Sequence, residues 1–163
     1  MDLQLNGLFP GSVQGDSVLA AMMEHFGVKT TFNENGIHLS KGPFNEKEPF
    51  RWDFLRCPDL AQSIAVVCAG LGRKGHFDGV ETLRIKETDR IDALKTELAK
   101  LNVEVRAFAE DNGSESFEVM GKALFSGIPS FDTYEDHRMA MAFAPLAMFQ
   151  PVAINEPMVV VKS

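Results

Sequence analysis

The stretch Arg84-Ile85-Lys86-Glu87-Thr88-Asp89-Arg90 places three cations and two carboxylates between an apolar run, residues 76–83, and an amphipathic helix. The run before it predicts a strand, and the apolar spacing after it predicts the helix. Lys86 and Arg90 are four residues apart, so on a helix they would repel each other unless an anion lay between them. A helix start also presents unpaired backbone N–H groups that favour anions. We therefore expect an anion site at this strand-to-helix turn.

The elements predicted around this turn occur twice in the same order, each unit reading βαββ followed by βαβ. Two Asn-Gly pairs mark the hairpins. The aspartates expected to cap the four helices are matched in spacing, Asp16 with Asp89 and Asp59 with Asp136. Such matched steps indicate an internal duplication. The sequence therefore predicts an α/β (α+β) fold in a single domain, residues 1–163, with repeats at approximately 3–76 and 77–153 and a truncated third copy.

Composition narrows the function classes. The 45% apolar content is enough for a sizeable core, and the net charge of −7 argues against a general nucleic-acid or anionic-membrane surface. Cys57 and Cys68 lie in apolar surroundings without metal-ligand spacing, so we expect reduced, buried thiols. No apolar run is long enough for a membrane helix and the first residues do not resemble a signal peptide, so we expect a cytoplasmic protein that contacts neither nucleic acid nor membrane.

Side chains that could do chemistry gather at the predicted helix starts, where ligands collect in α/β layers, and Lys162 follows the last predicted strand, residues 159–161. Each has an ordinary structural interpretation: a cap for Asp59, a surface partner of Arg90 for Glu87, a helix-start histidine for His137 and a solvated side chain for Lys162. Together, however, the cations suit a small molecule with phosphate and carboxylate groups, and the carboxylates could move protons. No metal-ligand cluster or glycine-rich phosphate loop is present, so we expect no cofactor or metal. The candidates are Asp59, Lys86, Glu87, Arg90, Asp136, His137, Arg138 and Lys162.

Two long motifs resemble those of a known enzyme family. The sequence Leu83-Arg84-Ile85-Lys86-Glu87-Thr88-Asp89-Arg90 and the sequence Asp136-His137-Arg138-Met139-Ala140-Met141 closely resemble 5-enolpyruvylshikimate-3-phosphate (EPSP) synthases. Gln14-Gly15-Asp16, Pro58-Asp59 and Val161-Lys162 fit the same family in the same order. The resemblance implies one lobe of the two-lobed enolpyruvyl transferase fold, in which each lobe contains three βαβαββ units. The second lobe, a short N-terminal segment and the final helix would then lie outside this chain.

The resemblance also implies an activity and residue roles. The family transfers the enolpyruvyl group of phosphoenolpyruvate to the 5-hydroxyl of shikimate 3-phosphate, releases phosphate and serves aromatic amino-acid biosynthesis. By this resemblance Asp59 accepts the hydroxyl proton and Glu87 donates a proton to the methylene carbon. Thr82 stands where many members carry an Asn that touches shikimate 3-phosphate, and its shorter side chain would lose or reroute that contact. By the same resemblance Lys86 contacts shikimate 3-phosphate and His137 lies beside the reacting centre. Phosphoenolpyruvate is held by Arg90, Arg138 and Lys162.

Two alternatives remain at this point. The related enzyme that transfers enolpyruvyl to UDP-N-acetylglucosamine shares the fold, although the Lys-Glu-Thr-Asp-Arg motif favours the shikimate branch. A non-catalytic anion-binding domain is the alternative of another class. We expect the full-length parent to be a monomeric transferase and this chain alone to be inactive, because its partner, the second lobe of the same enzyme, completes the cleft.

Overall fold

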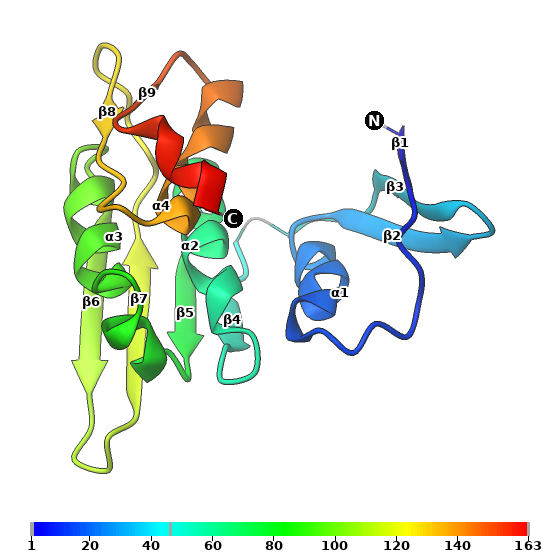
Figure 1. The fold of residues 1–163 in the computed structure, drawn as a ribbon, viewed down its shortest axis with the longest axis horizontal. Helices are drawn as coiled ribbons and strands as arrows, with labels where there is room; N and C mark the ends of the chain where they lie inside the picture. The colour runs from blue at the N-terminus through cyan, green and yellow to red at the C-terminus, as the bar shows by residue number, and fades with distance from the viewer. Residues whose placement is uncertain (1, 46, 163) are drawn as a thin grey trace. The chain divides into compact units, whose positions relative to one another are not determined.

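A computed structural model describes residues 2–45 and 47–162 of the chain, and it divides the chain into two compact units, residues 1–47 and 48–163. The predicted α/β class is confirmed (Figure 1). The order strand, helix, hairpin, strand, helix occurs twice along the chain. The single domain and the boundaries of the repeats stay predictions, and each unit is described by itself below.

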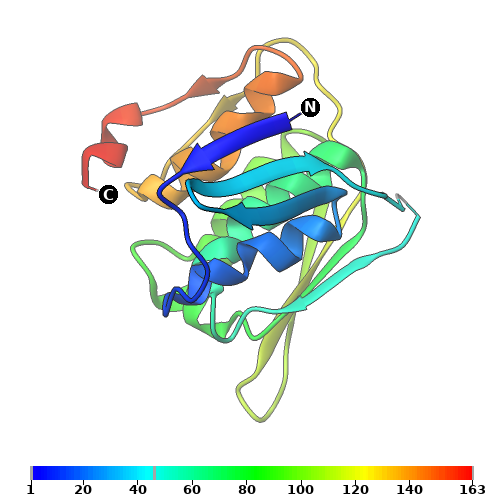
Figure 2. The same cartoon turned by 90° about the vertical axis from the view of Figure 1, so that its right-hand side faces the viewer.

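The first unit is a three-stranded antiparallel sheet with one helix (Figure 2). Its strands are β1 (Asp2–Asn6), β2 (Val28–Asn33) and β3 (Gly36–Lys41), in the order β1-β3-β2. The connection between β1 and β2 contains a 3-10 helix, η1 (Gly15–Val18), and α1 (Leu19–Glu24). The predicted hairpin is confirmed, and its turn is held by the side chain of Asn33, which accepts hydrogen bonds from two backbone N–H groups.

Mostly apolar side chains of β1, β2, β3 and α1 line a cavity of about 1070 Å³ within this unit. Leu3, Leu5 and Phe32 lie on the strands that line it and are exposed. Only Met22 is buried on α1, so among the described residues the helix adds little to a core. The first unit therefore has a small core of its own.

The second unit contains a four-stranded mixed sheet in the order β4-β5-β7-β6. Strand β4 (Phe50–Asp53) is parallel to β5 (Gly75–Asp78), whereas β6 (Glu104–Ala109) and β7 (Glu115–Met120) form the second predicted hairpin. Helices α2 (Ala61–Leu71) and α3 (Arg90–Ala99) contact these strands (Figure 1). Stacked Phe54, Phe77 and Phe117 are fully buried and form the centre of its core.

The remaining elements follow the hairpin. Strands β8 (Ser130–Phe131) and β9 (Ala153–Ile154) form a short parallel pair. Helix α4 (His137–Phe143) lies between them in the sequence and packs on α2. Pro145 lies where α4 changes to the 3-10 helix η4 (Ala144–Met148), as expected of a residue that cannot donate a helical hydrogen bond. Residues 159–161 were predicted as strand from their β-branched side chains, which is wrong, because they lie in the 3-10 helix η5 (Pro157–Lys162).

Both cysteines are reduced thiols with buried side chains, as predicted. Burial raises the pKa of Cys68 to about 12, so its thiol stays protonated near neutral pH. Cys57 directly precedes the 3-10 helix η2 (Pro58–Leu60), which carries Asp59. Across the described ranges, no helix has the length and apolar content to cross a membrane.

Candidate active site

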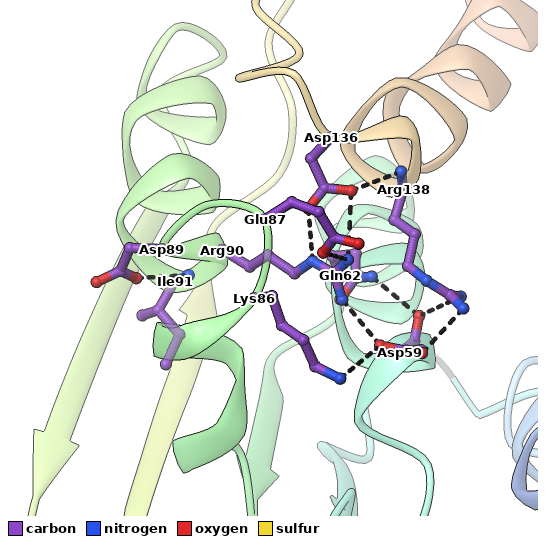
Figure 3. A network of polar contacts seen from close by, with 9 residues as sticks. All are labelled: Asp59, Gln62, Lys86, Glu87, Asp89, Arg90, Ile91, Asp136 and Arg138. Carbon is purple, nitrogen blue, oxygen red and sulfur yellow. Dashed lines mark hydrogen bonds and ion pairs between the residues drawn. The ribbon is translucent and has the colours of Figure 1, made fainter. Parts of the chain in front are cut away.

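Arg90, the first residue of α3, is the centre of the charged cluster (Figure 3). Its side chain is 1% exposed and bonds three carboxylates. Nε donates to Asp136 at 2.6 Å, Nη1 donates to Asp59 at 2.8 Å, and Nη2 donates to Glu87 at 2.8 Å. Burial alone would lower the pKa of Arg90, but the bonds from Asp136 and Asp59 outweigh burial and raise it. The guanidinium therefore stays charged and links the starts of α2, α3 and α4.

Asp59 is the second meeting point, because three cations share its carboxylate (Figure 3). Arg138 approaches one oxygen at 2.9 Å, while Arg90 at 2.8 Å and Lys86 at 3.4 Å share the other. Burial alone would raise the pKa of Asp59, but these three cations lower it below its ordinary value. Asp59 is thus held ionised. The expectation that Asp59 caps a helix is wrong: no side-chain cap bond starts η2 or α2, and the carboxylate faces the cations.

Lys86 does not lie on the helix, which was the condition for its repulsion by Arg90 at helical spacing. Lys86 is extended, with φ −86° and ψ −160°, and α3 begins at Arg90. An anion nevertheless lies between Lys86 and Arg90, as their like charges led us to expect. That anion is the carboxylate of Asp59, which comes from another segment of the protein.

Two of the four predicted aspartate caps are confirmed. Asp89 accepts bonds from the backbone N–H groups of Ile91 and Asp92 at the start of α3, and Asp136 accepts one from Arg138 at the start of α4. Asp136 is fully buried and also binds Arg90, so one carboxylate caps a helix and holds the central guanidinium. The cap at Asp136 therefore brings a residue 46 positions from Arg90 into the cluster, whereas Asp59, 31 positions away, joins the cluster without capping a helix.

Two features of the cluster have no counterpart among the residues predicted from the sequence: the pairing of Arg90 with Asp136 and the bond made by Gln62. The buried side chain of Gln62 donates to the backbone carbonyl of Asp59 at 2.9 Å, which fixes the turn that presents the Asp59 carboxylate. A glutamine three residues after Asp59 has the spacing of a capping box, but in that motif the side-chain oxygen accepts from a backbone N–H, whereas here the amide donates to a carbonyl, so the spacing gives no signal for this bond. The pairing of Arg90 with Asp136 has no local signal either, because it joins two distant segments.

Three of the predicted site residues lie outside this network of bonds. His137 is the half-buried first residue of α4, between two members of the cluster. Thr82 lies in the 3-10 helix η3 (Glu81–Ile85), where its hydroxyl oxygen is buried and has no hydrogen-bond partner within residues 2–45 and 47–162. For Lys162 the backbone ends η5, but its side chain lies outside the described part of the structure.

Arg84, at the start of the motif, forms a separate cluster. Its guanidinium bonds Glu115 on β7 at 2.6 and 2.8 Å, and Asp89 and Asp92 at 2.9 Å each. The bonds with Glu115 raise the pKa of Arg84, and the side chain remains 29% exposed. This cluster joins the start of α3 to the edge of the hairpin.

Three side chains of the cluster are partly exposed to solvent, so a substrate can reach them. Glu87 is 51% exposed, whereas the Arg90 to which it binds is buried. Lys86 and Arg138 are about one-third exposed. The arrangement therefore offers a buried, fixed arginine, two cations that solvent can reach, and two carboxylates that differ in exposure. Within the described ranges, no group of histidine, cysteine, aspartate and glutamate side chains could hold a metal ion.

The chain is similar to known proteins over nearly its whole length. Residues 2–163 match the family model described as EPSP synthase (3-phosphoshikimate 1-carboxyvinyltransferase). A 3-phosphoshikimate 1-carboxyvinyltransferase of Bacteroides fragilis is 44% identical over 164 residues, which cover 99% of this chain and 39% of that protein. The corresponding enzyme of Cellvibrio japonicus is 36% identical over 99% of this chain and 36% of its own length.

The fold has a similar solved structure. The EPSP synthase of Acinetobacter baumannii superposes with a TM-score of 0.64 over 98% of this chain and 38% of its own, at 18% identity. The chain thus spans about two-fifths of the length of the relatives that it matches. With a match over residues 2–163 and relatives above 30% identity, the chain belongs to the EPSP synthase family.

Proposed function

We propose that this chain contributes acid-base and anion-binding residues to a transferase that moves the enolpyruvyl group of phosphoenolpyruvate to the 5-hydroxyl of shikimate 3-phosphate. The observation that carries the proposal is the cluster in which Arg90 and Asp59 join Lys86, Glu87 and Arg138. The cations suit the phosphate and carboxylate groups of the two substrates. Membership of the EPSP synthase family favours shikimate 3-phosphate over UDP-N-acetylglucosamine as the acceptor.

The proposed reaction begins with addition. The 5-hydroxyl oxygen bonds to C2 of phosphoenolpyruvate, Asp59 accepts the hydroxyl proton, and Glu87 gives a proton to the methylene carbon, which becomes a methyl group. Elimination then breaks the bond between C2 and the phosphate oxygen, the methyl group returns a proton to Glu87, and inorganic phosphate leaves with the proton that Asp59 accepted. Atoms balance without a redox partner or cofactor. Glu87 is the more exposed carboxylate of the cluster, so a substrate can reach it.

The basicity of Asp59 should depend on whether substrates are bound. In this structure three cations lower the pKa of Asp59, which makes it a weak base. Substrate phosphate and carboxylate groups compete for the same cations. If Arg138 and Lys86 turn to the substrates, Asp59 loses counter-charges and becomes a stronger base when the hydroxyl is in place. The carboxylate thus occupies, without substrate, the position where a ligand anion is expected.

The other roles follow the same scheme. Arg90 and Arg138 would bind phosphoenolpyruvate and stabilise charge that develops on the departing phosphate. Lys86 would bind shikimate 3-phosphate, His137 would lie beside the reacting centre, and Lys162 would be a further phosphoenolpyruvate ligand. Thr82 would serve only if its buried hydroxyl became accessible. The full-length protein would be a monomeric cytoplasmic enzyme whose second lobe closes the site.

The test uses a chimera in which this chain replaces the matching 164 residues of the Bacteroides fragilis relative. We expect the chimera to release phosphate from shikimate 3-phosphate and phosphoenolpyruvate, and the 163-residue chain alone to bind phosphate weakly without turnover. Glu87→Gln should reduce kcat by about 10²- to 10⁴-fold. Glu104→Gln, on the exposed edge strand β6, is the matched control and should leave kcat unchanged.

Three outcomes would count against the proposal. A folded chimera without activity contradicts the transferase assignment. Full activity after Glu87→Gln removes the proposed proton donor. Phosphate release by the chain alone contradicts the expectation that another lobe completes the site.

A further inference from the structure

The buried carboxylate of Glu97 lies two helical turns after Arg90 on α3, outside the cluster described above. Its side chain is 0% exposed, and both oxygens are bonded. Oε1 accepts from the hydroxyl of Tyr134 at 2.6 Å, and Oε2 accepts from the backbone N–H of Asp132 at 3.0 Å and from Lys100 at 2.6 Å. A carboxylate taken out of water needs such partners. Two of the three donors belong to the segment that precedes α4, so Glu97 ties α3 to that segment.

The segment has an unfavourable backbone. Tyr134 and Glu135 are consecutive non-glycine residues in the left-handed region, with φ of 55° and 58°. Side chains of L-residues disfavour this conformation, and it persists where surrounding contacts enforce it. The bonds from Glu97 to Tyr134 and Asp132 are such contacts. The backbone N–H of Asp136 donates to the carbonyl of Thr133 at 2.8 Å and closes the turn.

The turn ends at the residue that holds the central arginine. Asp136 binds Nε of Arg90 and accepts from the backbone N–H of Arg138. Arg90 and Glu97 are seven residues apart, so they lie on the same face of α3. The helix therefore holds the turn at two places, by Arg90 at its C-terminal end and by Glu97 at its start and middle. A displacement of the turn would change the direction of the Asp136 carboxylate.

The donors to Glu97 keep their protons near neutral pH. Burial and the bond to Glu97 raise the pKa of Tyr134 to about 12. Burial alone would lower the pKa of Lys100, but the bonds to Glu97 and Asp132 outweigh it and raise that pKa. Hydrogen bonds to an ionised carboxylate are stronger than neutral ones.

We propose that Glu97 is a positioning residue: its buried carboxylate fixes the turn at residues 132–135, which orients Asp136 and so the guanidinium of Arg90. The inference rests on the proposed function only where it concerns catalysis, because the geometry of Arg90 is measurable without substrate. Among the described side chains, Glu97 has no hydrogen bond or ion pair with a member of the candidate catalytic set, so it acts through the turn.

The experiment follows the Nε–H signals of Arg90 and Arg84 by NMR in the 163-residue chain. Arg84 is an internal control because its Nε bonds Glu115, away from the turn. Tyr134→Phe removes one hydroxyl and retains the ring, so it is the mild variant. Glu97→Gln removes the charge and is the stronger one. Val105→Ala, at the buried position of the otherwise exposed strand β6, is a matched control that loosens the unit without touching the turn.

We expect hydrogen exchange at Nε of Arg90 to accelerate about threefold in Tyr134→Phe and about tenfold in Glu97→Gln, as loss of bonds to a charged group implies. Exchange at Arg84 should change less than twofold in both. A general loss of stability would accelerate both signals together, as expected for Val105→Ala. Parallel acceleration at Arg84 and Arg90 in the Glu97 and Tyr134 variants, or no change at Arg90, overturns the proposal.

A second measurement connects positioning to the reaction. In the chimera, Glu97→Gln should lower kcat/KM about tenfold, and unchanged kcat/KM would overturn the positioning role. If the unsubstituted chimera is inactive, the transferase proposal fails, yet the exchange ratio of Arg90 to Arg84 still decides whether Glu97 orients the arginine. The two failures are therefore distinguishable.

Discussion

Arg84 and Arg90 belong to one seven-residue motif, bind three carboxylates each, and have different surroundings. Arg90 points inward and meets carboxylates from the starts of three helices, including the fully buried Asp136. Arg84 remains partly exposed, and two of its three partners lie at the start of α3, eight or fewer residues away. Pairing of an arginine with carboxylates therefore organises the candidate site at Arg90, whereas at Arg84 it forms a partly exposed cluster of ion pairs.

The contrast teaches that burial, rather than the number of partners, separates the two arginines. Exposed ion pairs gain little because water and salt screen them. Breaking a buried pair is costly because the remaining charge has no solvent to replace its partner. The predictions below test this contrast in order of expected effect.

The largest effect is expected from removal of each arginine. Arg90→Ala leaves Asp136 buried and without its cation, so the free energy of unfolding should fall by about 3–5 kcal/mol. Arg84→Ala should cost about 1 kcal/mol. Urea unfolding followed by the fluorescence of Trp52, the single tryptophan, measures both. Equal losses in the two variants would break the contrast.

A smaller effect is expected at the two capping aspartates. Asparagine caps a helix about as well as aspartate, so Asp136→Asn and Asp89→Asn isolate the charge from the cap. We expect Asp136→Asn to cost about 2 kcal/mol, the value of a bond between charged groups. Asp89→Asn should cost about 0.5 kcal/mol because its pair with Arg84 is accessible to water. Calorimetric melting of both variants decides, and a larger loss at Asp89 would reverse the assignment.

The stability that Asp59 contributes to the Arg90 cluster should depend on pH. Its folded pKa is lowered, so the stability that it contributes is complete above the unfolded pKa of about 3.9 and is lost as the pH falls through the lower folded value. Wild type should exceed Asp59→Asn by about 1 kcal/mol at pH 6, with part of that advantage left just below pH 4. Urea midpoints at pH 6, 4 and 3 measure this. Loss of the advantage above pH 4 would contradict the lowered pKa.

Salt should give the smallest effect and act on one arginine only. At 1 M ionic strength the screening length is about 3 Å, so the cost of Arg84→Ala should shrink by about 0.5 kcal/mol. The cost of Arg90→Ala should stay constant, since Arg90 is enclosed. Repeating the urea titrations at 0.05 M and 1 M sodium chloride tests the difference. Equal salt dependence would indicate that solvent reaches both sites.

Local signals in the sequence predicted much of the fold. Periodicity and the Asn-Gly pairs identified the hairpins, and the caps of Asp89 and Asp136 were correct because the side chain bonds its own helix. The cap at Asp16 was wrong: Asp16 lies within η1, and no side-chain cap bond starts η1 or α1. The strand predicted at 76–83 ends at Asp78, because Gly79 turns the chain with φ 66°.

The site was predictable as a set of residues but not as a network. Charge type and helix starts identified Asp59, Lys86, Glu87, Arg90 and Arg138, which the structure brings together. Residue type could not show that cations from distant parts of the chain would bind the Asp59 carboxylate and keep it from capping the helix. It also could not show that Asp136 and Arg90, 46 residues apart, would form the buried pair, because that contact depends on how α3 and α4 pack.

The two buried cysteines provide built-in chemical reporters of motion. A thiol reagent can reach Cys57 when the neighbouring turn with Asp59 opens, so its labelling rate measures the opening of the turn that presents Asp59. Cys68 lies within α2, is fully buried and keeps its proton, so it should label only when the whole unit unfolds. The ratio of the two labelling rates would therefore separate local breathing of the site from global unfolding, without introducing a foreign probe.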